Sequence, residues 1–230
     1  MGGMNEDVLP VHLGFIVDGN RRWARERGLP TLEGHRRGRV KVEEVAEECF
    51  ERGVKFASFY IFSSENWERN EEEVGNLMKM VILEAPRLAK KMLKKNIKLV
   101  ILGGRGRGSE EVLAAVDKAE EITANCTGGT MGVCFDYGGR EEIVQAAQKL
   151  EERSEEISEE AIAKHLYRPE IPDCDMIVRT GGEQRISGFM LWRAAYSEFL
   201  FLDKKWPDMA KEDVGEILAE YARRNRRFGR

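Results

Sequence analysis

The sequence predicts an α/β protein: one domain over residues 1–230, with a central, mostly parallel six-stranded sheet flanked by helices. Short apolar runs alternate along the chain with longer segments of helical periodicity, the order expected of strands joined by crossover helices. The apolar runs are almost uninterrupted, as in strands that are covered on both faces of their sheet. No internal repeat, linker or low-complexity stretch divides the chain into separate domains.

Six apolar runs are the predicted strands: residues 11–17, 54–62, 97–103, 130–139, 174–182 and 198–202. The remaining segments are predicted helices, because their apolar residues recur every three or four positions: residues 34–52, 71–95, 109–125, 139–152, 159–166 and 211–227. The helix over 71–95 is the longest, and its apolar stripe is broad. Its methionines, Met78, Met80 and Met92, suit either an ordinary core or an adaptable apolar cavity.

The composition argues against several classes of protein. Lys and Arg number 37 against 41 Asp and Glu, a net charge of −4, so we expect no nucleic-acid binding. The four cysteines form no CxxC pair and only three histidines exist, so we expect reduced thiols and no structural zinc. No apolar run approaches the roughly 20 residues that span a bilayer, and the N-terminus lacks a signal-peptide core. We therefore expect a cytoplasmic protein.

Polar clusters that contain arginine follow four of the predicted strands: DGNRRW (18–23), SSENWER (63–69), DYGGR (136–140) and RTGGEQRIS (179–187). Because the carboxyl ends of parallel strands meet at one edge of a sheet, we expect these clusters to lie together. Arginine side chains bind phosphate, and so do backbone N–H groups that glycines leave accessible. Several arginines around a carboxylate predict a diphosphate site in which Asp18 is a ligand of Mg²⁺.

Each of these signals has a plainer interpretation when it is taken alone. Asp-Gly-Asn after a strand is usually a turn, and a single arginine at a strand end is usually solvated; four such clusters on one edge favour a binding site. The stretch GGRGRG (103–108) resembles a dinucleotide fingerprint, but Ser109 stands where the third glycine is required, so we predict a loop. His35 is either a helix cap or a ligand.

At these residues the sequence resembles the cis-prenyltransferases, the family of undecaprenyl and dehydrodolichyl diphosphate synthases. The similar segments follow family order along nearly the whole chain: DGNRRWA (18–24), GH (34–35), YIFSSENWER (60–69), DYGGREEI (136–143), IVRTGGEQRIS (177–187), LWRAAYSEFLF (191–201), WPD (206–208) and RRFG (226–229). The resemblance implies an enzyme that condenses isopentenyl diphosphate with an allylic prenyl diphosphate, such as farnesyl or geranylgeranyl diphosphate, into a Z-polyprenyl diphosphate. It also implies Mg²⁺, a hydrophobic tunnel between sheet and helices, and a homodimer. A long product would need to leave into lipid, which would require peripheral membrane contact.

The resemblance assigns roles to the matching residues. Asp18 is the metal-binding aspartate on which catalysis depends, Asn66 takes part in the loss of the proton, and Glu198 helps to place Mg²⁺. The residues implied in substrate binding are Gly19, Asn20, Arg21, Arg22, Trp23, His35, Phe62, Ser63, Trp67, Arg69, Arg179, Arg185, Ser187, Arg227 and Gly229. Of these, the three at 179–187 are implied in holding isopentenyl diphosphate, and the two at the C-terminus in reaching the neighbouring subunit.

The sequence departs from the common bacterial pattern of the family at several positions. Arg21 replaces a glycine, as in archaeal and eukaryotic-like members, which predicts an archaeal-type protein. Thr31 stands where bacterial members often have an arginine, and Gln184 replaces a histidine near the metal. Asn70 replaces a proline and is expected to loosen its loop.

Product length and acceptor are left open. Ile61 is bulkier than the frequent alanine beside the tunnel, and Gly129 is smaller than the frequent leucine near its floor, so the two predict opposite changes in length. The departures from the family pattern at Arg21, Thr31 and Gln184 motivate a second hypothesis. In this hypothesis the protein makes a short-chain transfer onto an alcohol or another allylic diphosphate. A third hypothesis is a non-catalytic subunit of a partner synthase, against which the retention of Asp18, Asn66 and Arg179 argues.

Overall fold

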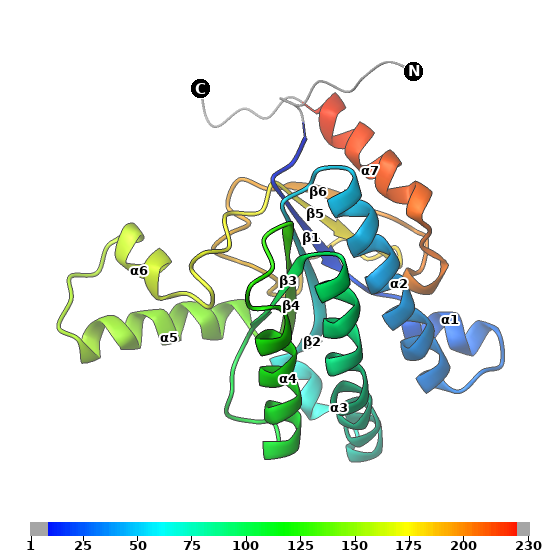
Figure 1. The fold of residues 1–230 in the computed structure, drawn as a ribbon, viewed down its shortest axis with the longest axis horizontal. Helices are drawn as coiled ribbons and strands as arrows, with labels where there is room; N and C mark the ends of the chain where they lie inside the picture. The colour runs from blue at the N-terminus through cyan, green and yellow to red at the C-terminus, as the bar shows by residue number, and fades with distance from the viewer. Residues whose placement is uncertain (1–8, 225–230) are drawn as a thin grey trace.

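The computed structural model describes residues 9–224, which contain a six-stranded sheet in the order β3-β4-β2-β1-β5-β6 (Figure 1). The strands are β1 (His12–Ile16), β2 (Phe56–Ser63), β3 (Ile97–Leu102), β4 (Gly129–Tyr137), β5 (Met176–Arg179) and β6 (Glu198–Phe201). All five neighbouring pairs are parallel, so the predicted sheet is confirmed and is parallel throughout. The carboxyl ends of the strands therefore lie along one edge, where ligands of open α/β sheets bind.

The helices of the described chain are α1 (Asn20–Glu26), α2 (Thr31–Glu51), α3 (Glu71–Lys94), α4 (Glu110–Thr123), α5 (Gly139–Glu152), α6 (Glu159–His165) and α7 (Lys211–Arg223), with 3₁₀ turns η2 (Ser64–Glu68) and η3 (Trp206–Asp208). Asn70 caps α3, because its Oδ1 accepts a hydrogen bond of 2.7 Å from the Glu73 N–H. Asn70 therefore stabilises the start of α3, a contact that was not predicted from the sequence.

The helices differ from the prediction at several points, including α7, which ends at Arg223 rather than at residue 227. No helix was predicted directly after β1, yet α1 forms there, because the left-handed Gly19 (φ +103°) turns the chain directly into a helix. Helix α2 begins at Thr31, three residues earlier than predicted, because Pro30 with φ −56° already has a helical φ in front of it. His35 consequently lies in the second turn of α2 rather than at its start.

The two faces of the sheet are covered differently. Helices α2, α3, α4 and α7 cover one face, and α5 and α6 extend away from the body of the molecule (Figure 1). The irregular chain between α6 and β6 contributes Ile171, Phe189 and Met190 to the core on the other face. All four cysteines are buried and free, as expected. Within residues 9–224 no helix is both long and apolar enough to cross a membrane.

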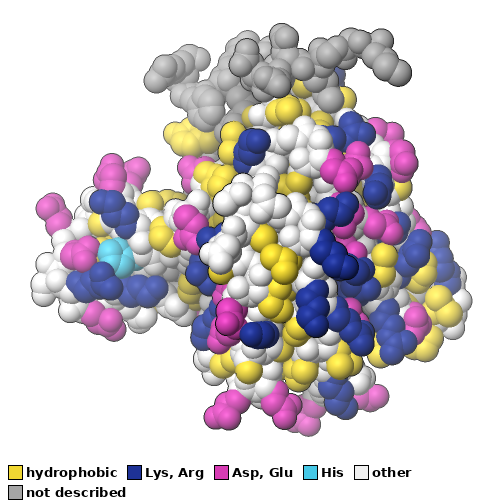
Figure 2. All heavy atoms as spheres, viewed as in Figure 1, with side chains coloured by type: hydrophobic (Ala, Val, Ile, Leu, Met, Phe, Trp, Pro, Cys, Tyr) yellow, Lys and Arg dark blue, Asp and Glu magenta, His cyan; other side chains and the backbone are white. Residues whose placement is uncertain are grey.

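The surface is strongly ionic, and its charges are not evenly spread. Figure 2 shows Lys and Arg side chains gathered over α1 and α2, on the right of the view. Arg21 and Arg36 are among the exposed residues of these helices, with 60% and 63% of their side chains accessible. This cationic area lies beside the carboxyl-end edge of the sheet, in a protein whose net charge is −4.

Candidate active site

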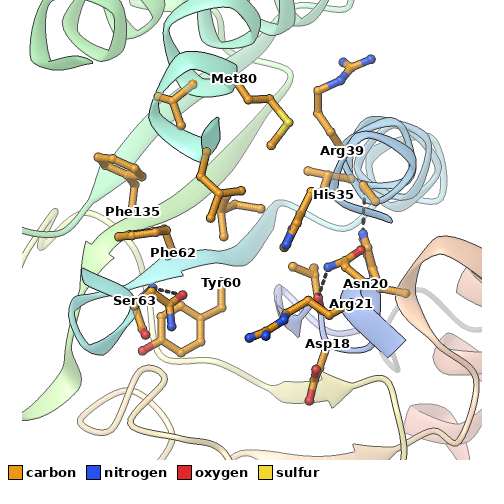
Figure 3. Close-up of a pocket in the computed structure, with 18 of the residues that line it drawn as sticks. Asp18, Asn20, Arg21, His35, Arg39, Tyr60, Phe62, Ser63, Met80 and Phe135 are labelled. Atoms are coloured by element: carbon orange, nitrogen blue, oxygen red, sulfur yellow. Dashed lines mark hydrogen bonds between the residues drawn. The ribbon is translucent and has the colours of Figure 1, made fainter. Parts of the chain in front are cut away.

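A cavity of about 950 Å³ opens at the carboxyl-end edge of the sheet and extends between the sheet and helices α2 and α3. Figure 3 shows its two characters, with Asp18, Arg21 and Ser63 on one side and Phe62, Phe135 and Met80 on the other. Further apolar side chains of α2, α3 and β3 line it, including Val42, Leu77, Val81, Leu88, Leu99 and Ile101. The predicted apolar tunnel between sheet and helices is present, and its mouth is polar.

Asp18 stands at the mouth, two residues after β1. Its Oδ1 accepts a hydrogen bond of 2.6 Å from the Gly19 N–H, which orients the carboxylate. Its Oδ2 accepts one of 2.9 Å from Arg179 and lies 3.3 Å from an Nη2 atom of Arg22. The side chain remains 32% exposed, so this carboxylate is fixed in place and still accessible from the cavity.

Arg179, the last residue of β5, is the most buried cation of the mouth. Only 5% of its side chain is exposed, and its Nη1 donates to the Arg185 carbonyl (2.6 Å) and to Ser187 Oγ (2.9 Å). Its Nε is buried and has no partner among the described residues. A buried donor without a partner costs free energy, so an anion beside Arg179 would satisfy it.

The balance of charge in the cavity favours an anionic ligand. Six arginines line it, Arg21, Arg22, Arg25, Arg39, Arg69 and Arg179, against three acids, Asp18, Glu65 and Glu84. Arg22 is braced by Glu183 at 3.5 Å, and Gly181 leaves room for it, since a Cβ there would lie 2.7 Å from its Nη2. A cluster of guanidinium groups of this kind is suited to phosphate.

His35 lies beside the mouth in a neutral form at pH 7. Burial lowers its pKa to about 4, helped by the positive charges of Arg69 and Arg21 and opposed by Glu73. The nearest acid atom, Glu73 Oε1, is 3.9 Å from His35 Nε2, and that nitrogen has no hydrogen-bond partner among the described residues. His35 can therefore offer a ligand a hydrogen bond without adding charge.

Helix α1 is held against α2 by a close backbone approach. A Cβ on Gly34 would lie 2.1 Å from the Asn20 carbonyl oxygen, and one on Gly38 would lie 2.1 Å from Asn20 Oδ1. Asn20 also donates from Nδ2 to the Val17 carbonyl at 2.8 Å. Gly34, the glycine of the GH segment (34–35), therefore has a packing role. It lets α1 approach α2 closely enough to bring Arg21 and Arg22 to the mouth.

Asn66 lies on the opposite wall, in the 3₁₀ turn η2 that follows β2. Its Oδ1 accepts a hydrogen bond of 3.2 Å from the Ser63 N–H, which ties the turn to the strand. Phe62, Ser63, Asn66 and Arg69 all line the cavity. Three of the four predicted clusters, 18–23, 63–69 and 179–187, therefore supply residues to one space, whereas residues 136–140 do not line it.

The donor set suits Mg²⁺ only in company with a phosphorylated ligand. Within residues 9–224 no three His, Cys, Asp or Glu side chains are grouped so as to hold a metal ion. Mg²⁺ commonly takes one or two carboxylates and completes its shell with water and phosphate oxygens. Asp18, accessible at the mouth of a cavity lined with arginines, fits that arrangement.

Comparison with known proteins identifies the family. Residues 16–229 match the family model described as "Putative undecaprenyl diphosphate synthase". The chain belongs to this family. It is 41% identical over 228 residues to an isoprenyl transferase of Neisseria meningitidis serogroup B, covering 99% of this chain and 92% of that protein. A decaprenyl diphosphate synthase of Mycobacterium leprae is 42% identical over 228 residues, with 96% of this chain and 77% of that protein covered.

A solved structure gives the same answer for the fold. The lavandulyl diphosphate synthase of Lavandula x intermedia, in complex with dimethylallyl diphosphate, superposes with a TM-score of 0.94 at 31% identity, covering 98% of this chain and 100% of that one. The protein is therefore a cis-prenyltransferase, an enzyme that transfers prenyl groups. Both sequence relatives described above are bacterial, and the expected archaeal-type affiliation finds no support in them.

Four residues implied by the resemblance do not line the cavity of this prenyltransferase. The Trp23 indole donates outward to Asp208 (2.6 Å), and Trp67 donates to Asp136 (2.7 Å) behind the wall. The Arg185 side chain is 60% exposed and pairs with Glu183. Glu198 begins β6, about 10 Å along the strand from the active edge, and pairs with Arg224 at 3.1 Å. Arg227 and Gly229 lie outside the described residues.

Several charged residues of the site were missed from the sequence: Arg25, Arg39 and Glu84 line the cavity, and Glu73 lies beside it. Glu73, in the first turn of α3, accepts a hydrogen bond of 3.0 Å from Arg69 and lies 3.9 Å from Arg21 and from His35. Its spacing of four residues from Arg69 is the signal that could have found it. Glu73 holds together three side chains from α1, α2 and the end of η2.

Of the two residues expected to affect product length, only one lines the cavity. Ile61 lines the cavity, as expected. Gly129 does not, and the Phe50 ring takes the space beside it, since a Cβ on Gly129 would lie 2.5 Å from Phe50 Cδ1. The argument that a small residue at 129 enlarges the tunnel is therefore wrong for this chain.

Proposed function

We propose that this cis-prenyltransferase elongates an allylic prenyl diphosphate, such as farnesyl or geranylgeranyl diphosphate, with isopentenyl diphosphate into a Z-polyprenyl diphosphate. One observation carries the proposal: a polar mouth that includes Arg21, Arg22 and Arg179 leads into the apolar part of a cavity of about 950 Å³. That combination fits an amphiphile with an anionic head and a hydrocarbon tail, and the name of the M. leprae relative is consistent with a long product.

The allylic head group binds at α1 in this proposal. Arg21 and Arg22 donate to its diphosphate, and His35 donates from its otherwise unpartnered Nε2. When the allylic C–O bond breaks, negative charge develops on the departing diphosphate. Guanidinium groups that are already fixed in a partly buried site stabilise that charge without reorganising.

Asp18 would hold Mg²⁺ together with the substrate phosphates. The metal ion would supply positive charge to the leaving diphosphate. Glu198 can join it only from a second copy of the chain, since within one copy it stands at the other end of β6 and pairs with Arg224. A homodimer, with Arg227 and Gly229 reaching the neighbouring site, belongs to the same proposal.

Isopentenyl diphosphate binds beside the allylic substrate, at Arg179, Ser187 and Arg185. The unpartnered Nε of Arg179 faces a buried position that an acceptor diphosphate would satisfy. Arg185 is exposed and must turn from Glu183 to take part. Asn66, with its amide anchored by Ser63, assists the loss of the proton from the new carbon chain.

A second candidate is a single transfer onto another acceptor, such as a second allylic diphosphate. The TM-score of 0.94 to a lavandulyl diphosphate synthase bound to dimethylallyl diphosphate favours keeping it. For either candidate we propose a cytoplasmic location without nucleic-acid partners. A long product would also require peripheral membrane contact during its release.

The deciding assay incubates the purified protein with Mg²⁺, labelled isopentenyl diphosphate and farnesyl or geranylgeranyl diphosphate, and measures product length. A ladder or one long product is expected, whereas one-step or ether products would favour the second candidate. Asp18→Asn should abolish the product, and Asp117→Asn, a matched acid on the exposed side of α4, should not. Absence of any product from the wild-type protein would refute the proposal.

A further inference from the structure

The GGRGRG loop, which the diphosphate site leaves unused, wraps around the end of β4. Gly103 adopts φ +145°, and a Cβ there would lie 1.8 Å from the Phe135 carbonyl oxygen. The Gly104 N–H donates to the Asp136 carbonyl at 2.9 Å, and a Cβ on Gly104 would lie 2.9 Å from Asp136 Oδ2. The two glycines are therefore required for the loop to enclose Asp136.

Asp136 is a buried carboxylate, and one of its oxygens accepts hydrogen bonds from two side chains, one charged and one neutral. Only 2% of the residue is exposed, and its Oδ1 accepts 2.7 Å hydrogen bonds from Arg107 Nη1 and from Trp67 Nε1. Arg107 also donates from Nη2 to Glu141 at 2.6 Å, so its guanidinium bridges two acids. Hydrogen bonds to an ionised acceptor are about twice as strong as neutral ones, which makes this an anchor for the indole.

The anchored indole belongs to the residue directly after Asn66. Trp67 also meets the Phe62 ring edge-to-face at a centroid distance of 5.0 Å, and Phe62 packs against Phe135 at 5.6 Å. Phe62, Phe135 and Asn66 line the cavity, while Trp67 lies behind them. Trp67 thus connects the wall of the cavity to Asp136.

We propose that Asp136, clamped by Arg107, is the positioning residue of the η2 turn. It acts through Trp67 to hold Asn66 and Phe62 at the reacting centre, and the inference rests on the role proposed above for Asn66. Neither Asp136 nor Arg107 touches the cavity, so neither contacts substrate. The basic loop is a brace for the catalytic wall rather than a phosphate site.

The test compares two arginines of the same loop. Arg107→Ala removes the clamp, whereas Arg105→Ala removes a guanidinium that pairs with Glu120 and Asp117 on α4 instead. Displacing a catalytic group by about 1 Å costs on the order of 100-fold in rate. We expect Arg107→Ala to lower kcat by roughly 10- to 100-fold with little change in the KM of the allylic diphosphate. Arg105→Ala should retain wild-type kcat.

Two further variants separate positioning from a general loss of structure. Asp136→Asn keeps an acceptor for the indole and tolerates the left-handed φ of +49°, so it should retain more activity than Asp136→Ala. Trp67→Phe removes the donor, and adding Arg107→Ala to it should lower kcat by much less than in the wild-type background. Equal losses in Arg105→Ala and Arg107→Ala, or additive losses with Trp67→Phe, would overturn the proposal.

Tryptophan fluorescence reports on the brace without any turnover. The emission of Trp67, taken as the difference between each protein and its Trp67→Phe counterpart, should shift to longer wavelength in Arg107→Ala and stay unchanged in Arg105→Ala. An unshifted Trp67 spectrum in Arg107→Ala would refute the positioning role. If the wild-type protein is inactive but Trp67 emission still shifts in Arg107→Ala, the proposed function is refuted. The structural link from Arg107 through Asp136 to Trp67 is then still supported.

Discussion

Lowering the pH from 7.5 to 4 should destabilise the fold by about 3 kcal/mol through His12 alone. His12 is fully buried at the start of β1, at the end of the sheet opposite the active edge. Its Nδ1 lies 2.9 Å from the Pro172 carbonyl oxygen, which can only accept, so Nδ1 carries the proton. Its Nε2, 2.9 Å from Ser58 Oγ, is then the acceptor of the serine hydroxyl. Protonation of Nε2 would end its role as acceptor and place a charge in a fully buried site.

The magnitude follows from the pKa of His12. The pKa is lowered from 6.5 to about 4, chiefly by burial and also by the charge of Arg193, against the raising effects of the Pro172 carbonyl and Asp175. Because the folded-state pKa is depressed, the unfolded chain binds the proton first as the pH falls through 6.5. The contribution of neutral His12 to the free energy of unfolding is fully present above pH 6.5. It decreases progressively as the pH falls from 6.5 to 4. A difference of 2.5 pKa units corresponds to about 3 kcal/mol.

The assay is urea unfolding of the wild type and of His12→Gln between pH 7.5 and 4. Glutamine offers one donor and one acceptor without titrating. The difference in unfolding free energy between the two proteins should change by about 2 kcal/mol at pH 5 and about 3 kcal/mol near pH 4. A difference that is independent of pH would show that His12 does not remain neutral in the folded protein.

Further substitutions test the active edge. Asp18→Ala should lower kcat at least about 100-fold in the condensation assay while the circular dichroism spectrum stays unchanged; near-normal turnover would exclude its metal role. Gly34→Ala places a Cβ 2.1 Å from the Asn20 carbonyl and should cost about 1–3 kcal/mol in urea unfolding and raise the KM of the allylic substrate; a neutral effect would contradict the close helix contact. Arg185→Ala should raise the KM of isopentenyl diphosphate at unchanged stability, and an unchanged KM would remove Arg185 from the site.

Much of the fold follows from the pattern of apolar runs. Long helices and buried strands have periodicities that differ clearly, and their alternation allows little besides a parallel sheet. Helix α1 was missed because it is only seven residues long and its polar sequence NRRWARE has almost no apolar stripe. What makes it a helix is tertiary: Gly34 and Gly38 let it approach α2. Contacts of that kind are not visible in a local pattern.

The sequence predicted those residues of the site that lie at the ends of predicted strands. Asp18, Asn66 and Arg179 lie at the end of a strand or within three residues of it, so the parallel sheet brings them to one edge. Trp67 and Glu198 were assigned by resemblance, and their side-chain directions depend on partners elsewhere, Asp136 and Arg224. Position along the chain determines which edge a residue reaches, but its partners determine where its side chain points.

The mouth is organised by acids that keep its arginines in place. Asp18 holds Arg179 and lies near Arg22, while Glu73 holds Arg69. Without these carboxylates the guanidinium groups would repel one another and point into solvent. Part of the binding free energy of a ligand would then be spent on ordering these side chains. In the proposed complex the diphosphate would take over the guanidinium groups that Asp18 holds, so that Asp18 could hold Mg²⁺ together with the phosphate oxygens. Metal and substrate should therefore bind Asp18 together, with Mg²⁺ affinity, measured by calorimetry, far weaker without an allylic diphosphate than with it.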